Sequence, residues 1–103
     1  MKKLNLDCDI IKRLSPDYIA ELKEKYLTQK IDDIINDDEF LNTIIAFFEN
    51  DLNISLTSQK TFMHRNTLCY RLDKIKKITG LNLRNFDDAI IFKILICISK
   101  NKK

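Results

Sequence analysis

The sequence predicts a small all-α protein, and three observations lead to this. The 103 residues include one glycine and one proline, too few for the many turns of a sheet protein. Apolar residues recur every third or fourth position instead of alternating with polar ones. At 45% hydrophobic and 32% charged residues, the chain can fill one small core but not two. We expect one compact body, with an N-terminal helical extension at 1–36 and a helix-turn-helix DNA-binding domain at 37–103.

The first long helix is predicted to begin at Ser15 and Pro16, which resemble a capping residue followed by proline in the first turn. Apolar residues then repeat at helical spacing: Tyr18, Ile19, Leu22, Tyr26 and Leu27. The pattern leaves open whether this helix breaks near Gln29 or continues through Ile31, Ile34 and Ile35.

Two further helices are predicted before residue 64. Asn36 followed by Glu39 has the spacing of a capping box, ahead of a wide apolar stripe that ends near Asn50. After a polar connection, Ser55 is expected to cap a helix of about two turns.

The best defined helix runs from Arg65 to Thr79. Its inward positions are predicted to be Leu68, Leu72, Ile75 and Thr79, and Gly80 follows as a left-handed C-cap. A short helix, a tight turn near Met63 and a longer helix form the arrangement that places a helix in the major groove of DNA.

The last helix is expected after Asn85 and Asp88, which have the spacing of a cap. Its apolar run at 89–99 contains Lys93 and is much shorter than the roughly 20 residues of a membrane span. Because it is apolar nearly all round, it is predicted to be enclosed or to form an interface. We therefore expect a homodimer built at least partly on residues 90–98, and no membrane association.

The charges are unevenly distributed along the chain. Residues 1–54 carry 7 basic and 12 acidic side chains, 55–84 carry 7 basic and 1 acidic, and 85–103 carry 4 basic and 2 acidic. The modest net charge of +3 thus conceals a net +6 on the segment with the helix-turn-helix pattern. This coincidence predicts double-stranded DNA as the partner.

A helical wheel assigns roles to the exposed side chains of this helix. With Leu68 inward, Asn66, Tyr70, Asp73 and Lys77 lie opposite, at roughly 100° per residue. The expected base readers are in the first turns, and the expected phosphate contacts flank them. The readers are His64, Arg65, Asn66, Cys69 and Tyr70, and the phosphate contacts are Thr67, Arg71, Lys74 and Lys76.

Asn66 and Asp73 each allow two interpretations. The Asn66 amide could read an adenine or cap the helix. Phosphates repel the Asp73 carboxylate, so it either accepts a hydrogen bond from a cytosine or is neutralised by Lys77, and the second interpretation is favoured.

Other chemistries find little support in the sequence. Cys8, Cys69 and Cys97 are far apart and odd in number, which favours reduced thiols that act as small hydrophobes. One histidine and no glycine-rich phosphate loop give no basis for an enzyme, a cofactor, a metal or a small-molecule site. The N-terminal residues do not resemble a secretory signal, so a cytoplasmic protein is expected. The alternative function is a protein-interaction module that partners a larger regulator without binding DNA itself.

The residues HRNTLCYRLDKIKKITGLNLR at 64–84 resemble the C-terminal helix-turn-helix domain of the PucR type, found in bacterial regulators of purine catabolism and sugar diacid use. The resemblance extends over roughly 37–99, and a looser one links the same turn to the DNA-binding end of the Fis nucleoid protein. It implies that DNA is contacted by His64, Arg65, Asn66, Thr67, Tyr70 and Arg71.

The chain departs from the family pattern in two places. Cys69 stands where the family usually has arginine, which removes one possible contact with DNA. Only residues 1–36 precede the domain, where the family normally has a long sensory region. The chain is therefore a stand-alone DNA binder, a protein that takes its signal from another protein, or a fragment.

Overall fold

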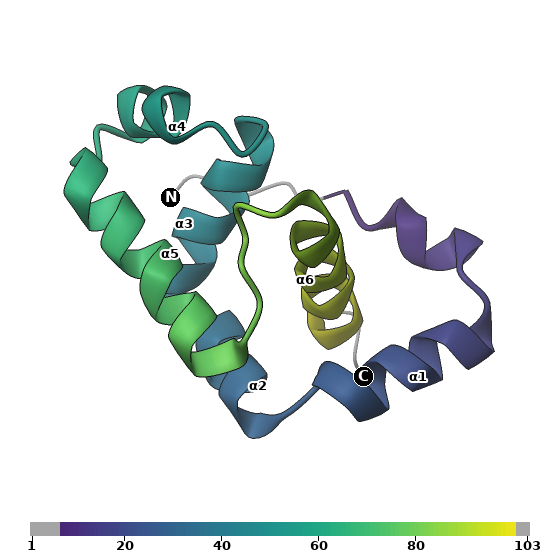
Figure 1. The fold of residues 1–103 in the computed structure, drawn as a ribbon. Coiled ribbons are helices and arrows are strands. Elements are labelled where there is room, and N and C mark those ends of the chain that lie inside the picture. The colour runs from purple at the N-terminus through teal and green to yellow at the C-terminus, as the bar shows by residue number, and fades with distance from the viewer. Residues whose placement is uncertain (1–6, 101–103) are drawn as a thin grey trace.

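The computed structural model describes residues 7–100 and contains a 3-10 helix and six α-helices, with no strand in this range. The elements are η1 (Asp9–Arg13), α1 (Pro16–Tyr26), α2 (Gln29–Ile35), α3 (Asp38–Glu49), α4 (Ile54–Thr61), α5 (Arg65–Thr79) and α6 (Phe86–Lys100). The predicted all-α fold, with a helix-turn-helix and an apolar C-terminal helix, is confirmed (Figure 1).

Several predicted helix ends are confirmed in atomic detail. The Ser15 hydroxyl accepts a hydrogen bond from the Tyr18 N–H, and Pro16 occupies the first turn of α1. The Asn85 side chain accepts from the Asp88 N–H at the start of α6. Gly80 ends α5 with φ 82°, and its N–H donates to the Lys76 carbonyl.

The first long helix breaks near Gln29, a point that the sequence pattern left open. Leu27 and Thr28 separate α1 from α2, and the Thr28 hydroxyl accepts from the Ile31 N–H. The chain therefore turns after α1, and α2 packs against α3, α5 and α6.

Two predicted caps were wrong. Asn36 ends α2 with helical backbone, and Asp37 caps α3 by accepting from the Phe40 N–H. Asn53, not Ser55, caps α4 by accepting from the Leu56 N–H. In both places two neighbouring polar residues can cap a helix, and the path of the preceding chain decides which one has the extended backbone that a cap requires.

The apolar residues form two clusters on either side of α6. The larger cluster joins α2, α3, α5 and α6 and includes Phe47, Leu68, Leu72 and Phe92. The smaller one lies between α6 and the N-terminal elements, where Ile94 and Ile98 meet Leu22 and the half-buried Ile10, Ile11, Leu14 and Ile19. The two-sided apolar pattern of α6 is therefore accounted for within one chain, because η1 and α1 cover one side and the main core covers the other (Figure 1).

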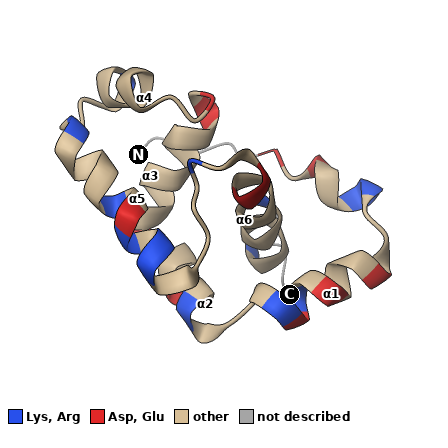
Figure 2. Ribbon diagram, in the orientation of Figure 1, with Lys and Arg blue, Asp and Glu red and all other residues tan. Residues whose placement is uncertain are grey.

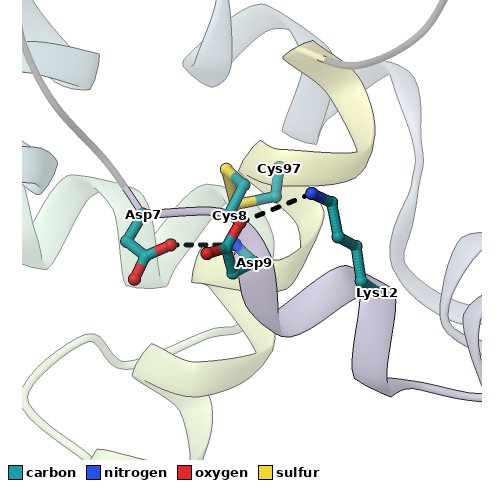
Figure 3. The surroundings of a disulfide bond; sticks show 5 residues. All are labelled: Asp7, Cys8, Asp9, Lys12 and Cys97. Carbon is teal, nitrogen blue, oxygen red and sulfur yellow. Dashed lines mark hydrogen bonds and ion pairs between the residues drawn. A yellow bond between two sulfur atoms is a disulfide. The ribbon is translucent and has the colours of Figure 1, made fainter.

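The expectation that the cysteines are reduced thiols was wrong for two of them. Cys8 and Cys97 form a disulfide, with their Cα atoms 5.5 Å apart, and it ties the beginning of η1 to α6 (Figure 3). Cys69 lies outside this bond. The sequence could not reveal the pair, because 89 residues separate its members and only the packing of η1 on α6 brings them together.

Candidate nucleic-acid interface

Helices α4 and α5 form the predicted helix-turn-helix. Three residues connect them, and the first, Phe62, has left-handed backbone with φ 60°. Its side chain is 94% exposed, so burial does not compensate for this conformation. The Ser58 hydroxyl closes the turn by donating to the Met63 carbonyl, and the buried Thr57 lies within α4. The turn between α4 and α5 is thus held by a short-range contact, and both helices also pack against α3.

His64 and Arg65 shape the start of α5. The His64 Nδ1 accepts from the Asn66 N–H at 3.1 Å, so His64 is the cap. The alternative in which the Asn66 amide caps the helix was wrong, since Asn66 contributes its backbone N–H and not its side chain. Arg65 donates from Nη1 to the Ser55 hydroxyl at 3.0 Å, which links the first turn of α5 to the first turn of α4.

Most of the predicted DNA-contacting residues are exposed. Seven of the nine are exposed, and two, Cys69 and Arg71, are half-buried. The exposed ones are His64, Arg65, Asn66, Thr67, Tyr70, Lys74 and Lys76. Leu68, Leu72 and Ile75 are fully buried, as the wheel predicts, whereas Thr79 is only half-buried. Four basic residues of α5, Arg65, Lys74, Lys76 and Lys77, are therefore exposed, and Figure 2 shows the basic positions distributed along the helix.

Tyr70 and Lys74 form a pair on the outer side of α5. The Lys74 Nζ lies 5.8 Å from the centre of the Tyr70 ring, within the range of a cation–π contact. Tyr70 is 61% exposed, and both residues line a surface hollow together with Asp73 and Lys77. An aromatic ring and a cation are thus presented side by side to any partner of this surface.

Arg71 is directed toward the protein. Its Nη1 donates to the hydroxyl of the buried Thr43 at 2.9 Å, and its Nη2 lies 3.9 Å from a carboxylate oxygen of Glu39. Thr43 in turn donates to the Glu39 carbonyl. Arg71 therefore connects α5 to α3, a role that the helical wheel did not indicate.

Asp73 is neutralised by a residue other than the predicted one. Its carboxylate accepts from Arg84 Nη1 at 2.8 Å, so Lys77 as the neutralising partner was wrong. Arg84 lies 11 residues further along the chain, in the connection from α5 to α6. A helical wheel describes the residues of α5 alone. It could not predict a contact with Arg84, which lies in the connection that follows this helix.

Two further features are absent from residues 7–100. No helix there is long and apolar enough to cross a membrane. The same residues contain no group of three or more histidine, cysteine or carboxylate side chains placed to hold a metal ion.

The fold and this surface define the class of the protein, a helix-turn-helix protein with a basic outer helix. The family described as the PucR C-terminal helix-turn-helix domain matches residues 40–96, more than half of the chain, and the chain belongs to this family. The resemblance to the PucR type is confirmed. No solved structure matches the chain significantly.

Similar proteins include three named regulators. The carbohydrate diacid regulator of Escherichia coli (strain K12) is 38% identical over 60 residues, which are 58% of this chain and 16% of the regulator. The purine catabolism regulatory protein of Bacillus subtilis (strain 168) is 30% identical over 60 residues, 58% of this chain and 11% of that protein. The transcriptional activator PmfR of Paenarthrobacter nicotinovorans is 40% identical over 50 residues, 48% of this chain and 11% of the activator. The matched segment thus spans less than a fifth of each of these three.

Proposed function

We propose that this chain is a sequence-specific, DNA-binding transcriptional regulator that inserts α5 into the major groove of double-stranded DNA. The observation that carries the proposal is the outward basic surface of α5 on a helix-turn-helix whose segment 55–84 has a net charge of +6. The names of three relatives, two regulators and one activator of transcription, support it. We place the protein in the cytoplasm, where bacterial DNA lies, and assign it no enzymatic role.

The proposed contacts divide into two groups. The base readers are His64, Arg65, Asn66 and Tyr70 in the first turns of α5, with the half-buried Cys69 at their edge. The phosphate contacts are Thr67, Lys74 and Lys76. We reassign Arg71 from phosphate binding to holding α5 against α3, because its guanidinium has partners inside the protein.

A titration of labelled duplex DNA at several salt concentrations tests the proposal. Each basic residue on a phosphate releases counterions, so the logarithm of affinity should fall linearly with the logarithm of salt. Lys74→Ala and Lys76→Ala should each reduce the slope by about 0.9. Lys23→Ala on the exposed surface of α1 is the matched control and should leave the slope unchanged. A flat dependence, or an equal effect of all three substitutions, would refute DNA binding by α5.

A protein-interaction module is the second candidate function. The observation that favours it is a surface hollow at the beginning of α6, lined by Phe48, Leu52, Phe86 and Ile90 among others, with Phe86 68% exposed. If the chain showed no salt-dependent affinity for DNA, or if Lys74→Ala and Lys76→Ala both left the affinity unchanged, the conclusion would shift to this function.

A homodimer remains a proposal, but the apolar residues of α6 no longer suffice as its interface. The apolar faces of α6 are largely enclosed within the chain, so a dimer would have to use residues outside 90–98 as well. A two-fold dimer would place two α5 helices on half-sites about one duplex turn apart. Sedimentation with and without DNA tests it, and a monomer in both samples contradicts it.

A further inference from the structure

Arg84 folds back from the α5–α6 connection onto the outer side of α5. Its Nη1 donates to the Asp73 carboxylate at 2.8 Å, and its side chain remains 35% exposed. The backbone that carries it is well anchored. The Arg84 N–H donates to the Asn82 side chain, and the Asn82 N–H donates to the Asp88 carboxylate. Arg84 is therefore held at both its backbone and its guanidinium.

The guanidinium lies beside the predicted reading surface. Asp73 and Cys69 are one turn apart on α5, and on the wheel they lie roughly 140° and 100° from Leu68. Asn66, a proposed reader, lies next to them at roughly 160°. The Arg84 guanidinium therefore lies on the same flank, although it belongs to a different part of the chain.

The surroundings of Arg84 support this placement. Burial alone lowers the pKa of the Arg84 guanidinium, but the hydrogen bond to Asp73 and the negative charge of its carboxylate outweigh burial and raise the pKa. A guanidinium has five N–H donors, and the contact with Asp73 uses one of them. The remaining donors can form further hydrogen bonds.

Stability does not account for the pair. Asp73 is the one acidic residue in the sequence 55–84, and its side chain is 67% exposed. Exposed ion pairs contribute little to stability, and a carboxylate on a DNA-binding surface repels phosphates. An arginine side chain that is already ordered in the free protein, however, loses less conformational entropy when it binds a phosphate.

We propose that Arg84 is a further phosphate-binding residue and that Asp73 is the positioning residue that orients it. The proposal rests on DNA binding by α5, as proposed above. The phosphate lies beside the Asn66 and Cys69 flank of α5, and the planar guanidinium binds it through two parallel N–H donors. Arg84 thereby supplies the positive charge that Cys69 does not.

A double-mutant cycle on DNA affinity tests both roles, with the full chain and a salt titration for each variant. Arg84→Ala should weaken binding about tenfold and reduce the salt slope by about 0.9. Arg84→Lys keeps the positive charge but loses the planar guanidinium with its two parallel N–H donors. This variant should therefore retain the salt slope of the parent chain and only part of its DNA affinity. Thermal melting of each variant confirms that it is folded.

Substitution of Asp73 is the more decisive test, because repulsion of DNA by Asp73 and positioning of Arg84 by Asp73 predict opposite changes in DNA affinity. If Asp73 only repels DNA, Asp73→Ala should tighten binding. If it positions Arg84, Asp73→Ala should weaken binding severalfold, and the same substitution in the Arg84→Ala background should tighten it. Asp73→Asn retains an oxygen that can accept from Arg84 and should bind at least as tightly as the parent chain.

The outcomes separate this inference from the proposed function. Tighter binding by Asp73→Ala in the parent chain, or an unchanged slope for Arg84→Ala, would overturn the inference. If Lys74→Ala still reduced the slope, DNA binding by α5 would stand. A parent chain without salt-dependent DNA binding would overturn both.

Discussion

Replacing Arg71 by methionine should destabilise the protein without removing a phosphate contact. Methionine keeps much of the apolar stem and loses the guanidinium. A hydrogen bond to a charged group contributes about 1.5 to 3 kcal/mol, and the bond at stake is the one at 2.9 Å to Thr43. The contact with Glu39 adds little, because it is 3.9 Å long and the Glu39 side chain is 81% exposed.

Two structural details place the loss at the lower end of that range. The Thr43 hydroxyl keeps its hydrogen bond to the Glu39 carbonyl, so it does not become unsatisfied. The Arg71 side chain is only 23% exposed, so the parent protein pays a desolvation penalty for this charge. The methionine variant avoids that penalty, which offsets part of the loss. We expect a loss of about 1.5 kcal/mol, and in a domain of this size the melting temperature should fall by roughly 6 to 12 °C.

Circular dichroism melts of Arg71→Met and of the parent measure this loss. Lys76→Met, an exposed change on the same helix, is the control and should alter stability by less than about 0.5 kcal/mol. DNA titrations well below the melting temperature should give Arg71→Met the same salt slope as the parent. An unchanged melting temperature together with a slope reduced by about 0.9 would show that Arg71 binds phosphate, and would refute the reasoning.

Three other changes should have distinct effects. Reduction of the Cys8–Cys97 bond, which closes a loop with a sequence separation of 89, should lower the free energy of unfolding by at most roughly 4.5 kcal/mol, as melts with and without reductant will show. A Cys8→Ser variant should not respond to reductant. Phe62→Gly should raise the free energy of unfolding by about 0.5 kcal/mol. Glycine removes about 1 to 2 kcal/mol of strain in the left-handed backbone, but its greater conformational entropy in the unfolded chain offsets part of this gain. A lower stability in a denaturant titration would mean that the exposed phenyl ring is packed. Asn66→Ala and Tyr70→Ala should leave melting unchanged and reduce discrimination between selected and scrambled duplexes by about 1 to 3 kcal/mol each. If both variants kept full discrimination, the reading role would move to neighbouring residues.

The sequence by itself determined the helical class, the helix-turn-helix and the family. These features depend on local patterns: the spacing of Leu68, Leu72 and Ile75, the glycine at the end of α5, and the charge of 55–84. Each is a property of residues within one or two turns of each other, so periodicity and capping preferences are enough to recognise them. The exposed surface of α5 was predictable for the same reason.

Only the tertiary structure decided which partners distant residues have. Arg71 meets Thr43 across 28 residues, Arg84 returns to Asp73 across 11, and Cys8 meets Cys97 across 89. Helical periodicity gives the direction of a side chain from its own axis but not the element that lies there. The same limit explains α6: its apolar pattern is compatible with an interface or with burial, and the packing of η1 and α1 on one side of α6 decided for burial.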